Sequence, residues 1–104
     1  MDRLAKLRTL LDANPRDGFV LYGIAQEEAK RGEHEAAIGL YDRLIEVEPG
    51  HCYAFFFKAR SLAALGRVDE AKRIASEGLA VARRLGDEKA ANELGGLQTE
   101  LELA

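Results

Sequence analysis

The side chains that could bind a metal or attack a substrate are few in this chain. His51 and Cys52 are adjacent near an expected turn, and His34 lies seventeen residues earlier in another turn. Zinc requires four ligands at characteristic spacings, so this set is too small for a zinc site. A lone cysteine generally behaves as a small buried apolar side chain. We therefore expect no metal, no cofactor and no catalytic nucleophile.

The carboxylates predict a solvated surface and not an acid–base pair. Lys30, Arg31 and Arg43 stand at helical spacings from them, which is typical of an ion-paired face. Acid–base catalysis needs a cleft that raises one pKa, and the sequence indicates no such cleft. We therefore expect no enzymatic activity. The carboxylates concerned are Glu27, Glu28, Glu33, Glu35, Glu46 and Glu48.

Composition limits the class of partner. The 104 residues, 11.4 kDa in mass, carry 15 basic and 18 acidic side chains. This length allows one domain with a modest core, and the net charge of −3 does not suggest the basic face that nucleic acids require. Residues 1–12 alternate charges with leucines, so they predict neither a signal peptide nor a membrane span. We expect a cytoplasmic protein with no nucleic-acid or membrane partner.

A spacing of 34 residues recurs along the chain. It separates the only two prolines, Pro15 and Pro49, and a fixed period of this length predicts a stack of similar units. Each unit contains two amphipathic segments with apolar residues at i, i+3, i+4 and i+7, joined at a glycine. The same spacing separates Gly32 from Gly66, Ala37 from Ala71, Ala25 from Ala59, Val47 from Val81, Leu21 from Phe55 and Ile45 from Leu79.

The two ends of the chain differ from the repeated units. The leucines before Pro15 match a second helix 34 residues later, so this segment is a second helix without its first. The last amphipathic segment does not match the period and is expected to cap the stack. The sequence predicts six helices in a single domain, 1–104, with a half repeat over 1–14, repeats over 18–50 and 52–85, and a C-terminal capping helix over 87–104.

The repeated pair of helices resembles the tetratricopeptide repeat. In the first unit the matching residues are Leu21, Ile24, Ala25, Ala37, Tyr41 and Pro49. The second unit departs from the pattern at Lys58, Ala75 and Arg83, which stand in the leucine, aromatic and proline slots. The resemblance covers residues 2–85. It implies an all-α fold, a right-handed α-solenoid of antiparallel helix pairs, that serves as a protein-interaction module.

The first helices of successive units would line a concave face in such a stack. A helical wheel, at 100° per residue, places one stripe of each first helix opposite its core side. The resemblance implies the same stripe for the groove. Aromatic rings with two cations among them suit a peptide or partner helix that carries an acidic group. The candidate partner-binding residues are Phe19, Tyr22, Gln26, Lys30, Tyr53, Phe56, Phe57 and Arg60.

The same aromatic face could instead be covered by the protein itself. The C-terminal helix could lie over Phe56 and Phe57, or a second copy of the chain could, as a homodimer interface. One subgroup of the family grips the C-terminal carboxylate of heat-shock chaperones, but its clamp is absent because Tyr22, Gln26 and Phe57 occupy the slots. We predict a non-catalytic interaction module or adaptor; the alternative is a self-associating structural protein.

Overall fold

The computed structural model describes residues 2–104, so Met1, the first residue of the predicted half repeat, lies outside them. Six helices and no strand occur in the described chain, as predicted. None of these helices is long and apolar enough to cross a membrane. The helices are α1 (Arg3–Ala13), α2 (Gly18–Lys30), α3 (His34–Val47), α4 (Cys52–Ala64), α5 (Val68–Leu85) and α6 (Glu88–Glu102).

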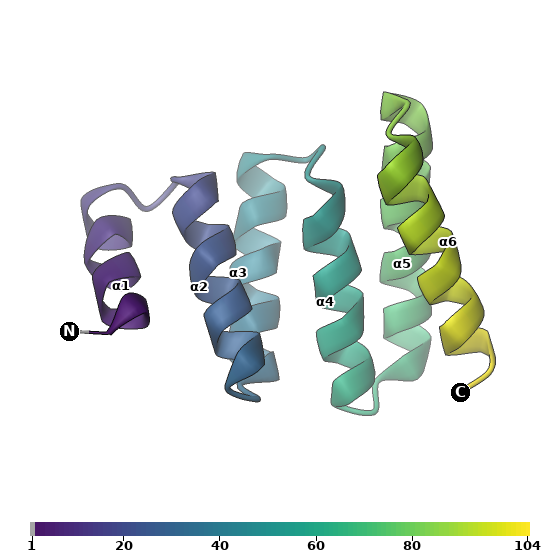
Figure 1. Cartoon of the computed structure of the whole chain (residues 1–104), viewed down its shortest axis with the longest axis horizontal. Helices are drawn as coiled ribbons and strands as arrows, with labels where there is room; N and C mark the ends of the chain where they lie inside the picture. Colours follow the sequence, from purple (N-terminus) through teal and green to yellow (C-terminus); the bar gives the residue numbers. More distant parts are fainter. Residues whose placement is uncertain (1) are drawn as a thin grey trace.

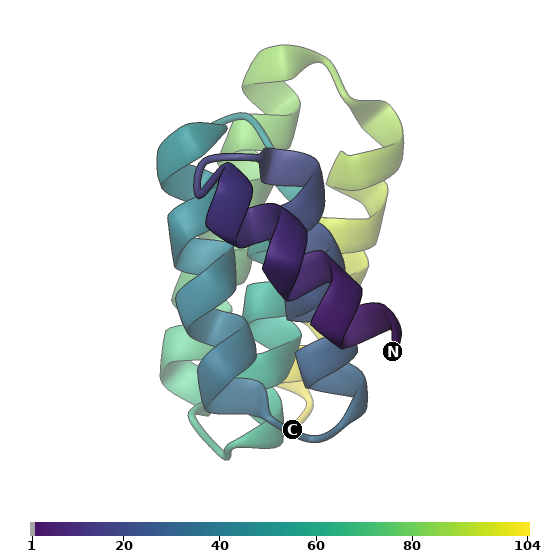
Figure 2. The same cartoon turned by 90° about the vertical axis from the view of Figure 1, so that its left-hand side faces the viewer.

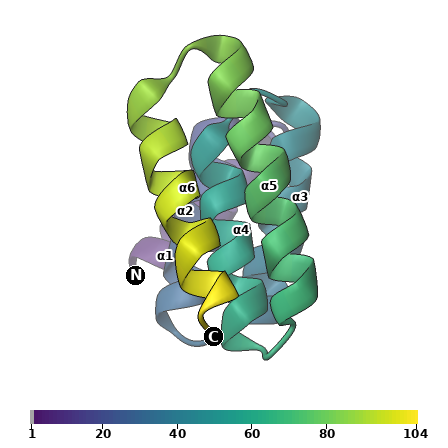
Figure 3. The ribbon, with the colours of Figure 1, turned by 90° about the vertical axis from the view of Figure 1, so that its right-hand side faces the viewer.

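Consecutive helices run in opposite directions and form two layers (Figure 1). Helices α2, α4 and α6 lie in the nearer layer of that view, while α3 and α5 lie behind them. At one end α1 packs on α2 and crosses it obliquely (Figure 2). At the other end α6 packs on both α5 and α4 (Figure 3). The face formed by α2, α4 and α6 is called the concave face below.

Short-range signals set where the helices begin and turn. The Asp17 carboxylate accepts a hydrogen bond from the Val20 N–H, and Asp87 does the same for Ala90, so each caps a helix N-terminus. Gly32 and Gly66 close the turns within the two helix pairs, at φ of 80° and 79°. Residues that carry a side chain rarely adopt this left-handed backbone conformation, which explains why glycine recurs at these two positions.

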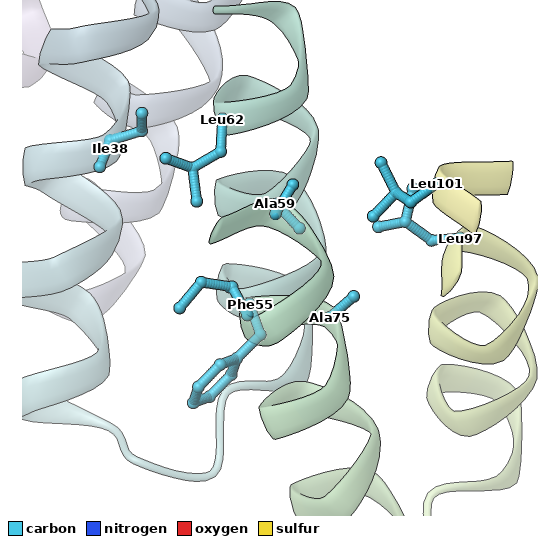
Figure 4. Packing of buried hydrophobic residues seen from close by; sticks show 9 residues of the cluster. Ile38, Phe55, Ala59, Leu62, Ala75, Leu97 and Leu101 are labelled. Carbon is cyan, nitrogen blue, oxygen red and sulfur yellow. The ribbon is translucent and has the colours of Figure 1, made fainter. Parts of the chain in front are cut away.

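Small buried residues let the helices approach one another closely. Ala25, Ala37, Ala59 and Ala71, which recur at the 34-residue spacing, are all fully buried. Bulky side chains fill the spaces beside them, and one apolar cluster joins α3, α4, α5 and α6. Figure 4 shows part of this cluster, with Leu97 and Leu101 of α6 facing the pair formed by α4 and α5. The predicted packing role of the small residues is confirmed.

The last helix follows the repeat more closely than its sequence suggested. Its buried residues Ala90, Leu94 and Leu97 stand 35 residues after Phe55, Ala59 and Leu62, the core residues of α4. The extra residue arises because no proline ends α5, which has 18 residues where α3 has 14. Helix α6 therefore lies beside α4 as the first helix of a further repeat would, and it extends the concave face.

A pair of glycine substitutions tests the close packing of α4 against α5. A Cβ at Gly78 would lie 2.6 Å from the Phe55 Cβ and 3.0 Å from the Leu94 Cδ2. We predict that Gly78→Ala lowers the free energy of unfolding by about 1–3 kcal/mol, because Phe55 cannot move its Cβ away. The control is Gly39→Ala, whose Cβ meets nothing within 4 Å and which should raise stability by about 0.5–1 kcal/mol. Urea unfolding measures both; equal effects would contradict the packing.

Candidate functional site

Four aromatic rings form a continuous ridge on the concave face. Phe57 stands at its centre, with ring centroids 5.0 Å from Phe56, 6.2 Å from Tyr22 and 6.5 Å from Tyr53. All four side chains are half-buried, so each keeps part of its ring at the surface. The structure thus brings together four of the aromatic residues that the helical wheel selected: Tyr22 of α2 and Tyr53, Phe56 and Phe57 of α4.

A buried layer beneath the ridge holds the rings in place. Tyr41 of α3 is fully buried, and its ring lies nearly parallel to Phe57 at 6.5 Å. The Tyr41 hydroxyl donates a hydrogen bond to the Gln26 Oε1 at 3.1 Å. His51 packs its ring 4.9 Å from that of Tyr22. These contacts fix the positions of Tyr22, Phe57 and Gln26.

The histidine and cysteine considered for chemistry have structural surroundings. The His51 Nδ1 accepts the N–H of Ala54, which caps the N-terminus of α4. Cys52 is buried, burial raises the pKa of its thiol, and its Sγ donates to the Gly50 carbonyl oxygen at 3.6 Å. Between residues 2 and 104 no three His, Cys, Asp or Glu side chains converge as metal ligands would.

A first hollow of about 390 Å³ lies between α2 and α4, on one side of the ridge. Lys30 and Arg60 line it, both exposed, together with His34, whose Nδ1 lies 3.1 Å from the Ser61 Oγ. No carboxylate is among its lining residues. The remaining lining residues are Gln26, Ala29, Phe57 and Ala64.

A second hollow of about 280 Å³ lies between α4 and α6, on the other side of the ridge. Phe56 and Leu97 form its apolar part, and Glu93 and Glu100 add two carboxylates. Arg60 lines this hollow as well, with its guanidinium carbon 5.8 Å from the centre of the Phe56 ring. Helix α6 therefore covers one side of Phe56, as the capping alternative expected, and leaves Phe57 facing the first hollow.

Phe19 stands apart from the other candidate residues. It is 81% exposed, makes no ring contact and lines neither hollow. It shares the stripe of Tyr22 on α2 but lies in the first turn of that helix, and α1 packs on α2 through Leu4 and Leu7, which cluster with Val20 and Ile24. Three polar residues that line the hollows were not among the predicted site residues: His34, Glu93 and Glu100. The 35-residue spacing of the α6 core was the signal that could have placed the two glutamates.

Comparison with known proteins identifies the architecture. A family model described as tetratricopeptide repeat matches residues 4–46 and 22–76. The chain belongs to the tetratricopeptide repeat family. Such folds are commonly non-catalytic modules for protein–protein interaction. An uncharacterized protein of Methanocaldococcus jannaschii is 33% identical over 79 residues, which span 76% of this chain and 92% of that protein.

Solved structures share the tetratricopeptide fold. A tetratricopeptide repeat domain protein of Salinibacter ruber superposes with a TM-score of 0.78 at 29% identity, covering 86% of this chain and 90% of that one. The Yersinia enterocolitica type III secretion translocator chaperone SycD gives a TM-score of 0.87 at 14% identity, covering 96% of this chain and 70% of that one. At that identity the likeness shows the fold alone. The region of this chain that superposes on SycD extends into α6, so the last helix belongs to the shared fold.

The tyrosines of this site should make stability sensitive to alkaline pH. Burial raises the pKa of Tyr41, of Tyr22 and, with help from the Glu93 carboxylate, of Tyr53. The unfolded chain therefore loses these protons first, at about pH 10. The contribution of these tyrosines to the free energy of unfolding should be constant below about pH 10 and fall as the pH rises above it.

Urea unfolding of the wild type and of Tyr41→Phe measures this dependence. The variant should be less stable at neutral pH by about 1 kcal/mol, since it lacks the hydrogen bond to Gln26. It should also lose less stability between about pH 9 and about pH 12, because one raised pKa is gone. An equal alkaline loss in both proteins would contradict the assignment.

Proposed function

We propose that this chain is a non-catalytic interaction module that binds a peptide or a partner helix across the concave face. The observation that carries the proposal is the aromatic ridge: four contiguous, half-buried rings at the surface with a hollow on either side. Rigid aromatic rings that are already packed from below are the side chains most often found as binding anchors.

The shape of the concave face supports a segment with alternating side chains. The ridge separates the two hollows, so a chain crossing α4 would place apolar side chains on the rings and neighbouring side chains into the hollows. The cations Lys30 and Arg60 around the first hollow favour an acidic group there. The proposed binding residues are those predicted from the sequence, with Phe19 at the margin.

The division of the chain follows from the same proposal. The half repeat (1–14) and the capping segment (87–104) would enclose the repeats (18–50 and 52–85) and keep the ends of their core from solvent. The last segment would have a second task, because its α6 forms one wall of the second hollow. Under this proposal the helix stack has no catalytic role. It holds α2, α4 and α6 at the spacing that the bound segment needs.

Selection from a random-peptide library displayed on phage tests the proposal. The immobilised wild type should enrich a family of peptides, and Arg60→Glu should bind a synthetic copy at least ~10-fold more weakly, a loss of about 1.4 kcal/mol. The matched control is Arg73→Glu on α5, an exposed arginine outside both hollows, which should bind as the wild type does. Circular dichroism checks that both variants fold.

Two outcomes would contradict the proposal. One is that no peptide is enriched on the folded wild type. The other is that Arg60→Glu and Arg73→Glu bind the selected peptide equally well. Sedimentation at several concentrations examines the second copy as the occupant: a dimer that dissociates in the Arg60→Glu variant would assign the ridge to self-association.

A further inference from the structure

We propose that opposite charges on the two sides of the ridge orient the bound segment. Its acidic side chain would lie over the first hollow, between α2 and α4, and its basic side chain over the second, between α4 and α6. The apolar anchor between them would rest on Phe56 and Phe57. This inference rests on the proposed function and deepens it, because it specifies the partner as an acidic–apolar–basic segment.

The first hollow carries positive charge that its own surroundings do not neutralise. Lys30 lies 3.7 Å from the Glu27 Oε1, but Arg3 contacts the same oxygen at 3.1 Å, so one carboxylate serves two cations. Arg60 forms no ion pair within residues 2–104; its guanidinium lies over the Phe56 ring instead. Because no lining residue is acidic, a carboxylate entering this hollow would meet Lys30 and Arg60, with Glu27 as the nearest acidic neighbour of Lys30.

The second hollow carries the opposite excess. Glu93 and Glu100 face one cation, Arg60, which also belongs to the first hollow. Neither glutamate forms an ion pair anywhere in the described part of the chain. The negative charge of Glu93 is felt at the ridge, since it contributes to raising the pKa of Tyr53. A basic side chain in this hollow would meet two carboxylates that form no ion pair within residues 2–104.

The reversed orientation would bring like charges together. An acidic side chain placed over α6 would face Glu93 and Glu100, and a basic one placed over α2 would face Lys30 and Arg60. Such contacts discriminate between partners more strongly than favourable pairs increase affinity. The two hollows adjoin through Arg60, so the two charges of the segment must closely flank its apolar anchor.

The sequences that the phage library yields test this inference. Wild-type selections should be enriched in an apolar residue with an acidic side chain on one side and a basic side chain on the other. The double variant Glu93→Lys, Glu100→Lys should keep the acidic preference and lose the basic one. The matched control is Glu46→Lys, Glu77→Lys on the exposed surfaces of α3 and α5, which should select the same pattern as the wild type.

A synthetic peptide in which the acidic and basic residues exchange places gives the decisive comparison. Its composition is unchanged, and it should bind the wild type about 10-fold more weakly than the selected peptide. Equal binding of the two peptides, or selected peptides without a charge pattern, would overturn the inference while the proposed function stands. Failure of the folded wild type to enrich any peptide would overturn the proposed function and this inference with it.

Discussion

The close packing of α4 on three other helices is the constraint on which the rest of the structure depends. Helix α4 contacts α3, α5 and α6, and buries Phe55, Ala59 and Leu62 among them. Gly78 of α5 makes room for Phe55, since a Cβ there would collide with it. One side of α4 is buried in this core. Large side chains on its other side therefore lie on the concave face. Helices α5 and α6 lie beside α4 in Figure 3, and α4 supplies three of the four rings of the aromatic ridge, Tyr53, Phe56 and Phe57.

The helices on either side of α4 give the ridge two different flanks. Helix α2 and the start of α3 supply Lys30 and His34, whereas α6 supplies Glu93 and Glu100. Arg60 of α4 lines both hollows, so the surface charge changes from positive to negative across this single helix. A surface that is apolar along its centre and oppositely charged at its sides differs from a uniform basic trough, because it would distinguish the two orientations of a bound segment. Under the proposed function, the last helix would contribute to recognition as well as cover the end of the core.

The sequence predicted the repeated part of the fold because packing constrains that part most. The 34-residue spacing of alanines, glycines and prolines reflects helix pairs that bury the same positions, and α2 to α5 follow it. The place of α6 was missed because Arg83 stands where a proline would end α5, and the extra turn shifts the next core by one residue. The helical wheel found the rings of the ridge but also selected Phe19, since a wheel gives the angle around a helix and not the height at which a neighbour lies. His34 required knowledge that the start of α3 lies beside α4, and Glu93 and Glu100 required the 35-residue spacing that places α6 beside α4.

The aromatic ridge between the two hollows is the proposed place of recognition. Solution NMR can examine this proposal: isotope-labelled protein is titrated with a peptide enriched on the wild type, and the backbone and aromatic signals are followed. Binding across the ridge should give the largest shifts to Tyr22, Phe57 and Arg60, with smaller shifts along α6 and none on the outer surfaces of α3 and α5. Shifts confined to those outer surfaces, with the ring signals of Tyr22 and Phe57 unmoved at saturation, would contradict it.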